Sequence, residues 1–403
     1  MSEMNVNTVR RERTFRHRDR LSQIPIYLGK QFRFFINESD WKVIPMAAVI
    51  ALLVAVVIRT RLFASMEGCL ISSFALACVA LWNGCFNSIQ AICRERAIVK
   101  REHRSGMHIT SYVAAHMIYQ LVLCLAQTII SMYVLKAAGV PFPEEGIFSE
   151  KRGILEFGFT MLMISYAADM MSLFISSIAH TTTAAMTVMP FVLIFQLVFS
   201  GGIIPIPAAI QPLSNLTISN YGIKAIVSQC RYNELPMAAG WTAVNSMKNS
   251  EIHEEITVGQ ILDILNSEAM AKHRNHVVTE PVTAAQLADL LNLGEVKNKD
   301  TLIIEEPVTL GELIDFANSS ELIQKQKDRK IPIDTTVGEV LELFGEQNVK
   351  VYIQQKTAEA GRKDQYESTV SNLVINWFCL GLFILLFALM STISLELIDK
   401  DKR

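Results

Sequence analysis

The sequence lacks the cysteine patterns of a disulfide-stapled or zinc-binding protein. Its seven cysteines are scattered, no two are spaced as Cys-x-x-Cys, and most fall inside apolar segments. This distribution is typical of thiols buried in a protein core or in lipid, so neither a disulfide framework nor a metal site is predicted. Cys230 lies outside the apolar segments and is the one candidate for an intermolecular bridge.

A phosphate-binding loop and a secretory leader are also missing. No Gly-x-x-x-x-Gly-Lys-Ser/Thr occurs in the 403 residues, which argues against ATP binding by that route. Arginines crowd residues 10–20, but no apolar core with a small-residue cleavage site follows within reach. We therefore expect residues 1–23 to form a basic cytoplasmic tail, with attraction to anionic lipid as a second role.

Long apolar runs, by contrast, are abundant. Hydrophobic residues make up 51% of the chain and charged residues 19%, which is too apolar for an ordinary soluble protein and too charged for one wholly in the membrane. Six runs approach the roughly 20 residues that a membrane-spanning helix needs. They cover residues 43–63, 70–92, 109–135, 154–179, 183–204 and 373–393. The predicted fold class is an α-helical polytopic membrane protein with six transmembrane helices, five within residues 41–204 and the sixth within 369–395.

A charged segment, residues 94–112, separates the second run from the third. It reads RERAIVKREHRSGMHITSY. Each Arg or Lys at a bilayer centre costs roughly 2.5 to 3.5 kcal/mol even on generous insertion scales, so we expect a loop here. Its excess of Arg and Lys predicts a cytoplasmic position for residues 94–108. Both termini, including the tail at 396–403, are then also cytoplasmic.

The segment just before the first run, residues 24–40, interleaves aromatic and aliphatic residues with Lys30 and Arg33. This pattern favours an amphipathic helix lying at the membrane interface. A helix of a soluble domain is the alternative, but the apolar run that begins immediately afterwards favours the interface.

A polar insertion separates the fifth and sixth runs and is predicted to be extracytoplasmic, with a turn or re-entrant region at 205–250 and repeats at 251–368. Four threonines, 26, 26 and 27 residues apart (283−257, 309−283, 336−309), are each followed three residues later by Gln or Glu. The pairs are Thr257/Gln260, Thr283/Gln286, Thr309/Glu312 and Thr336/Glu339. This spacing is a capping box, in which two side chains satisfy free backbone N–H groups where a helix begins.

Short extended runs precede several of these predicted helix starts, for example at residues 301–304 and 331–333. Each repeat therefore predicts a strand followed by a helix. Units this small must pack on one another, which indicates a compact α/β repeat module. A soluble enzyme domain is the alternative, but the repeats contain no nucleophile, metal cluster or Gly-rich phosphate loop to support it.

Three groups of residues together resemble a known family. The first group lies in the charged segment and comprises Glu-Arg at 95–96, Arg-Glu at 101–102, Ser-Gly at 105–106 and Ser-Tyr at 111–112. The second is Asn-x-Cys-Phe at 83–86, in the second apolar run. The third is Phe-Ser-Gly at 199–201, followed by Ser-x-Tyr-Gly-x-x-Ala at 219–225 and Asn-Glu at 233–234. In order and spacing they resemble the transmembrane half of G-subfamily half-transporters, the white/brown and multidrug-type members of the type-2 ABC exporter superfamily. The resemblance covers about residues 24–234 and the last span, but not the repeats.

The resemblance implies roles for particular residues. In such exporters the first cytoplasmic loop is a coupling helix that docks on the ATPase subunit, and the substrate slot lies at the dimer axis. The expected roles are ATPase coupling for Glu95, Arg96, Arg101 and Glu102, a substrate cavity for Asn83, Phe86, Ile194 and Leu197, and an outer gate for Gly202 and Ile203. At the gate the family carries two bulky residues, so Gly202 is a departure that puts this gate in doubt.

Asp169 is the only acidic residue well inside a predicted span. Such a residue should face protein or water and have a partner. A proton relay and a hydrogen-bonded structural carboxyl are both open, and the structural role is favoured.

The function implied is that of a permease subunit of an ATP-driven exporter, moving a hydrophobic or amphipathic substrate outward by alternating access without enzymatic activity of its own. The expected partners are a separate ATPase subunit holding ATP and Mg²⁺, a second copy of the chain and membrane lipid; no nucleic acid, cofactor or metal ion is expected on this chain. The cell membrane is the expected location, with residues 205–368 outside. The alternative is a membrane-anchored extracytoplasmic binding or sensing protein that works through residues 251–368.

Overall fold

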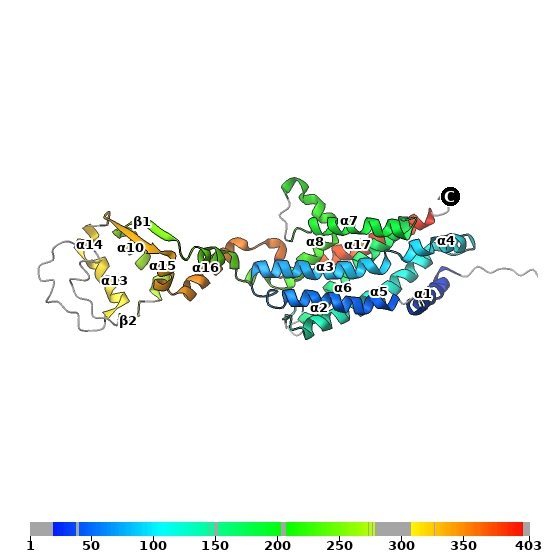
Figure 1. The fold of residues 1–403 in the computed structure, drawn as a ribbon, viewed down its shortest axis with the longest axis horizontal. Coiled ribbons are helices and arrows are strands. Elements are labelled where there is room, and N and C mark those ends of the chain that lie inside the picture. The colour runs from blue at the N-terminus through cyan, green and yellow to red at the C-terminus, as the bar shows by residue number, and fades with distance from the viewer. Residues whose placement is uncertain are drawn as a thin grey trace, which may run out of the picture. The chain divides into compact units, whose positions relative to one another are not determined.

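The computed structural model describes residues 19–37, 40–143, 145–148, 152–202, 207–272, 274–275, 277–278, 308–325 and 327–397. The chain divides into two compact units (Figure 1). Unit 1 comprises Met1–Trp241 with Val351–Arg403, and unit 2 comprises Thr242–Lys350.

Unit 1 is helical throughout its described residues. Its long helices are α1 (Arg20–Asn37), α2 (Val43–Ile58), α3 (Met66–Ser88), α4 (Ala91–Arg104), α5 (Ile109–Ala137), α6 (Gly153–Ile178), α7 (Thr182–Val198), α8 (Ile218–Gln229) and α17 (Val370–Glu396). Short helices connect them: η1 (Asp40–Lys42), η2 (Ala208–Leu216), η3 (Tyr232–Glu234) and η4 (Asp364–Tyr366), while α9 (Ala238–Ser246) and α16 (Glu346–Gly361) cross the unit boundaries.

Five helical stretches of the described chain are long and apolar enough to cross a membrane, which confirms a multi-pass membrane protein. They are Asp40–Ile58, Met66–Arg104, Ile109–Ala137, Gly153–Ile178 and Val370–Glu396. The apolar helix α7 is shorter, with 17 residues. Two predicted spans were too long, because α2 ends at Ile58, before Arg59 and Arg61, and α7 ends at Val198, before the turn at Phe199. Residues 203–206 lie outside the described residues.

Helices α3 and α6 pack closely because their facing residues are small. Ser73, Ala77, Ala80, Gly84 and Ser88 on α3 are buried, and so are Ser165, Ala168, Ser172 and Ser176 on α6. A Cβ added to Gly84 would collide with the carbonyl oxygen of Ser165. Small residues let two helix backbones approach, and within a membrane such packing replaces the hydrophobic effect as the main attraction between helices. The α3–α6 pair is therefore a rigid centre of unit 1.

Cys230 is buried in unit 1, at the end of α8, with 1% of its surface exposed. A thiol so enclosed cannot reach another chain. The prediction of an intermolecular bridge through Cys230 is therefore wrong.

Unit 2 alternates strands with short helices. In chain order these are β1 (Glu251–Thr257), α10 (Val258–Leu265), α11 (Glu268–Ala271), β2 (Val277–Val278), β3 (Val308–Thr309), α13 (Leu310–Ser319), α14 (Glu321–Lys325), β4 (Lys330–Thr336) and α15 (Val337–Phe344). Strand β1 pairs antiparallel with β4, and β2 pairs antiparallel with β3.

Three of the four predicted capping boxes are confirmed. Thr257 with Gln260 and Thr336 with Glu339 form complete boxes, and Thr309 exchanges the same two hydrogen bonds with Glu312. The extended run at 331–333 lies in β4, as predicted. The fourth box, at Thr283 and Gln286, and the run at 301–304 lie outside the described residues.

The two strand pairs share one register. In each pair, the capping threonine of one repeat lies opposite a residue six positions before the repeat threonine of the other in sequence. Thr336 faces Glu251, six residues before Thr257, and Thr309 faces Val277, six residues before the repeat position 283. The first repeat therefore pairs with the fourth and the second with the third.

Glycines near the start of three helices of unit 2 make close backbone contacts with other repeats. The N–H groups of Gly259, Gly311 and Gly338 donate to the carbonyl oxygens of Lys327, Arg274 and Lys248, at 2.9, 2.7 and 2.8 Å. A Cβ at these glycines would lie 3.3, 3.0 and 3.1 Å from the same oxygens. The close approach accounts for Thr-x-Gly in three of the repeats.

Candidate functional site

Helix α4 carries most of the charged segment, and its C-terminal end is defined by sequence. Arg101, His103 and Arg104 occupy its last turn, where cations interact favourably with the negative end of the helix dipole. Gly106 follows with φ of +103°, a left-handed conformation that glycine adopts without strain. The loop expected from the charge of this segment is therefore wrong for residues 94–104, which form a helix followed by a tight turn. Helix α5 begins directly afterwards at Ile109.

Two carboxylates of α4 meet one lysine of α1. Lys30 Nζ lies 3.1 Å from Glu95 Oε2 and 3.6 Å from Glu102 Oε1. Glu95 and Glu102 are seven residues apart, about two helical turns, so they lie on one face of α4. The Glu95 side chain is only 6% exposed, whereas those of Lys30 and Glu102 are 24% and 31% exposed. Helix α1 is thus tied to α4 by a shared, partly buried ion pair.

A second side of α4 is tied to α6. The Arg96 guanidinium donates to the carbonyl oxygens of Ser177 at 2.6 Å and Ala179 at 3.5 Å, where α6 ends. At the start of α4, the Ser176 hydroxyl accepts from the N–H groups of Ile92 and Cys93, at 3.0 and 3.1 Å. Carbonyls at a helix C-terminus lack partners within the helix, so a cation there satisfies them and opposes the dipole.

The turn after α4 is bound to the first turns of α1. The side chain of Gln23 accepts from His108 N–H at 3.0 Å and donates to the Gly106 carbonyl at 3.3 Å. The rings of Tyr27 and Tyr112 pack edge to face with centroids 5.8 Å apart. Burial raises the pKa of Tyr27, and the negative charge of Glu102 raises it further. Helices α1 and α4 and the start of α5 therefore form one interlocked block.

A stripe of α4 remains exposed. It consists of Arg94, Ala97, Ile98, Arg101, Arg104 and the following Ser105. These positions recur at three- and four-residue intervals, so they lie along one helix face. Of the four residues predicted to couple to an ATPase, only Arg101 lies on this exposed stripe; the other three contact α1 or α6 within the chain.

The residues predicted to line a substrate cavity lie on α3 and α7. Asn83 is buried, Leu197 is half-buried, and Phe86 and Ile194 are 44% and 57% exposed. Phe86 lines the cavity described below, whereas the other three are not among its lining residues. Within one copy of the chain these four residues do not share that cavity.

Asp169 lies at the meeting point of α3, α5 and α6 and is fully buried. Its carboxyl group accepts hydrogen bonds from the Ser88 hydroxyl and, at 3.4 Å, from the Cys124 thiol. This geometry gives the carboxyl the partners that a polar group needs in an apolar bundle.

The predicted outer gate is only partly described. Gly202 is buried, and a Cβ placed on it would lie 3.2 Å from a methyl group of Ile223. Ile203 lies outside the described residues.

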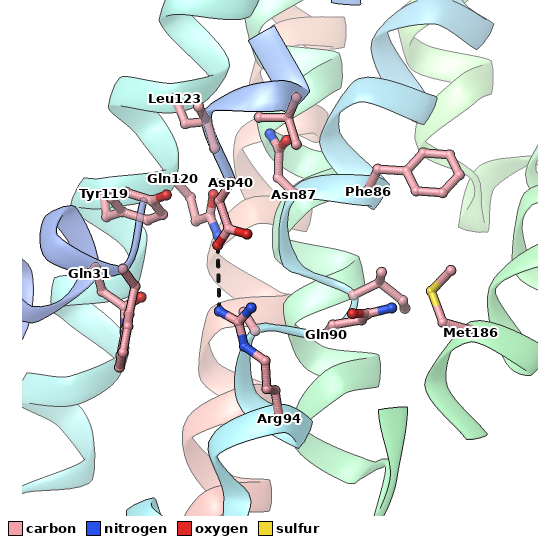
Figure 2. A pocket seen from close by; sticks show the side chains of 14 residues that line it. Gln31, Asp40, Phe86, Asn87, Gln90, Arg94, Tyr119, Gln120, Leu123 and Met186 are labelled. Carbon is pink, nitrogen blue, oxygen red and sulfur yellow. Dashed lines mark hydrogen bonds and ion pairs between the residues drawn. The ribbon is translucent and has the colours of Figure 1, made fainter. Parts of the chain in front are cut away.

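A cavity of about 190 Å³ lies between α1, η1, α2, α3, α4, α5 and α7, and the sequence did not predict it. Polar side chains line it, including Gln31, Asp40, Asn87, Arg94 and Gln120 (Figure 2). Arg94 reaches from the start of α4 to Asp40, with Nη2 and Oδ2 3.5 Å apart. Charged residues at the edges of two apolar runs were the only sequence signal for this site.

Comparison with known proteins gives two matches. Residues 30–229 match the family of ABC-2 type transporters. A stretch of 148 residues is 29% identical to part of an ABC transporter ATP-binding/permease protein of Mycobacterium tuberculosis. The matched stretch covers 36% of this chain and 17% of that protein. The chain therefore matches a small part of this relative, and residues 30–229, just under half of the chain, are similar to the membrane domain of ABC-2 type transporters.

Proposed function

Because residues 30–229 are similar to the membrane domain of ABC-2 type transporters, we propose that the chain is the permease subunit of an ATP-driven exporter for a hydrophobic or amphipathic substrate. The resemblance to G-subfamily half-transporters supports this direction of transport. In the proposed topology both termini and α4 are cytoplasmic, α7 crosses the membrane as a sixth span, and residues 205–368 are extracytoplasmic with unit 2 as an α/β repeat module. The complex contains two copies of the permease.

The observation that carries the proposal is the double attachment of α4. The stripe with Arg101 is exposed in one copy of the chain and is assigned here to the ATPase, while Lys30 and Arg96 tie the same helix to α1 and to the end of α6. A force on the stripe therefore acts on both helices together. Since α6 packs on α3 through Gly84 and Ser165, the movement reaches the helix that carries Asn83 and Phe86.

In our proposal a separate ATPase subunit drives this movement. The Mycobacterium tuberculosis relative is named as an ATP-binding/permease protein, so it joins both functions in one chain. The sequence here has no Gly-x-x-x-x-Gly-Lys-Ser/Thr, and ATP with Mg²⁺ is therefore assigned to the partner. Closure of the ATPase on ATP pushes α4 and shifts the population from an inward-open to an outward-open state.

Copurification tests the proposal. The tagged chain, solubilised from its native membrane, should bring down an ABC ATPase, and the double charge reversal Arg101→Glu with Glu102→Lys should release it. The matched control is Arg33→Glu, which reverses an exposed charge on α1. Absence of any ATPase, or an intact complex after the double reversal, would contradict the proposal.

A second function is favoured by the regular construction of unit 2. Three capping boxes, one strand register and three glycine contacts recur in it, which is more order than a passive insertion requires. In this alternative the unit binds or senses a ligand outside the cell, and the helices transmit the signal. Deleting residues 251–354 should then abolish function while charge changes in α4 leave it intact, the reverse of what the transporter proposal expects.

A further inference from the structure

Asn233 joins the two chain segments that lead into and out of unit 2. Its side-chain Nδ2 donates to the carbonyl oxygen of Lys363 at 3.1 Å, and its Oδ1 accepts from the N–H group of Lys363, also at 3.1 Å. The Asn233 carbonyl oxygen accepts from Arg362 Nε at 3.2 Å. Asn233 belongs to the Asn-Glu pair of the family resemblance, and the transport mechanism proposed above gives it no role. These bonds hold the segment before unit 2 against the segment after it.

Helix α9 follows this junction and helix α16 precedes it, and the two helices pack closely. A Cβ added to Gly240 of α9 would lie 2.7 Å from Cγ2 of Thr357 and 3.2 Å from Cγ2 of Ile353, both on α16. A side chain at position 240 would therefore displace α16. Both helices continue into unit 2, α9 beyond Trp241 and α16 before Val351. Because short helices are rigid, the α9–α16 pair carries a displacement of unit 2 to the residues of unit 1 that hold the pair.

The first turn of α3 binds the start of α9. Glu67 Oε2 accepts from the N–H group of Ala238 at 3.0 Å, and Oε1 accepts from that of Ala239 at 2.9 Å. The N–H groups in the first turn of a helix have no partner within the helix, and a carboxylate there also interacts favourably with the helix dipole. The N–H group of Met66 donates to the carbonyl oxygen of Pro236 at 3.0 Å. Three hydrogen bonds thus join the beginning of α3 to the beginning of α9.

The end of α16 contacts the same turn of α3. A Cβ added to Gly361 would lie 2.9 Å from the sulfur of Met66. The Tyr232 hydroxyl donates to the Gly361 carbonyl oxygen at 3.4 Å. Together with the hydrogen bonds of Glu67 and Asn233, these contacts form a clamp between α3 and the α9–α16 pair.

Helix α3 connects this clamp to the proposed transport path. Its 23 residues span about 35 Å, and the helix begins at the clamp and carries Asn83 and Phe86 near its other end. Close packing on α6 at Gly84 leaves α3 little freedom to bend there. Since a rigid helix does not shift at one end alone, a displacement of α3 moves the clamp, and a restraint on the clamp opposes the displacement.

We propose that Glu67 and Asn233 are positioning residues that couple unit 2 to α3, so that restraining unit 2 slows the transport cycle. The effect on transport rests on the proposed function, whereas the coupling is a property of this chain alone. Glu67 carries the larger share, because its carboxylate is the one charged group in the clamp that bonds α3 directly to α9.

Hydrogen–deuterium exchange of the purified full-length chain tests the coupling without an ATPase. The restraint is an antibody fragment raised against the full-length chain and selected for an epitope within residues 251–344. Its binding should slow exchange of the Met66 amide in the wild type several-fold. In Glu67→Gln the Ala238 and Ala239 amides should exchange about tenfold faster than in the wild type, and the fragment should no longer affect Met66.

Two further variants complete the exchange measurement. Asn233→Ala should lose the response of Met66 in the same way, because the segments before and after unit 2 are then no longer joined. Glu359→Gln makes the same substitution as Glu67→Gln on the exposed side of α16, and it should respond to the fragment like the wild type.

ATPase activity of the reconstituted complex tests the effect on transport. The fragment should lower the activity of the wild-type complex several-fold and leave that of the Glu67→Gln complex unchanged. An unaltered Met66 exchange in the wild type with the fragment bound, or a wild-type response in a monodisperse Glu67→Gln preparation, would overturn the coupling. An ATPase activity that the fragment does not change, despite slower Met66 exchange, would overturn the regulation. If no ATPase copurifies with the chain, the proposed function fails, and the exchange measurement still decides the coupling.

Discussion

Replacing Lys30 with methionine tests the interlocked block most sharply. Methionine keeps the length and apolar stem of lysine but removes the charge that lies 3.1 Å from Glu95 and 3.6 Å from Glu102. Two carboxylates then share one face of α4 without a cation between them. Breaking a buried pair costs about 3 to 5 kcal/mol. We expect the lower end, about 3 kcal/mol, because Lys30 and Glu102 are partly exposed and water screens them.

The loss should show in both stability and coupling. Thermal unfolding of purified Lys30→Met should occur at a lower temperature than that of the wild type, and its ATPase partner should lose most of its stimulation by the permease. Adding Glu95→Gln should restore much of the stability, because the neutral amide needs no cation. Arg33→Met, an exposed charge on the same helix, serves as the control. If Lys30→Met has the unfolding temperature and the ATPase stimulation of the wild type, the ion pair between α1 and α4 neither stabilises the protein nor transmits the movement.

Four further predictions follow from individual contacts. Arg96→Ala should destabilise the chain by roughly 1.5 kcal/mol in chemical denaturation, since the carbonyls at the end of α6 lose a charged donor. Gly84→Ala should cost roughly 1 to 3 kcal/mol through overpacking against α6, whereas Gly29→Ala, with open space around it, should stabilise helix α1 slightly. Asp169→Asn should leave the pH dependence of transport unchanged, because two side chains already hold the carboxyl; a shifted profile would support a proton relay. Hydrogen bonds from the backbone N–H and then from the side chain of Thr309 lower the pKa of Glu312. The ionised Glu312 carboxylate should therefore stabilise unit 2 at neutral pH, and this stabilisation should be lost as the pH falls and the carboxylate is protonated. NMR titration of the Glu312 carboxyl group can follow the loss.

Features that depend on local sequence were predictable. The capping boxes at Thr257, Thr309 and Thr336 follow from a three-residue spacing, and the helix that each begins is found where the spacing puts it. The place of the charged segment outside the membrane stays a prediction, which rests on the exclusion of charge from hydrocarbon.

Features that depend on packing between distant segments were not predictable. Lys30 and Glu95 are far apart in sequence, and nothing in either segment indicates that the two side chains form an ion pair. The same holds for Arg96, which the family resemblance would place on a docking surface, and for Cys230, whose burial depends on the helices that pack around it. The cavity at Asp40 and Gln120 combines residues from seven helical elements, so it exists only in the folded chain.

The most direct test of the account is the ATPase activity of the reconstituted complex with Arg101 reversed in charge. Arg101 lies on the exposed stripe of α4, so Arg101→Glu should leave the fold of the permease intact and abolish its stimulation of the ATPase. Arg33→Glu should leave the stimulation unchanged. Full stimulation by Arg101→Glu, in a complex shown to contain both subunits, would contradict the claim that α4 is the helix through which ATP hydrolysis drives this protein.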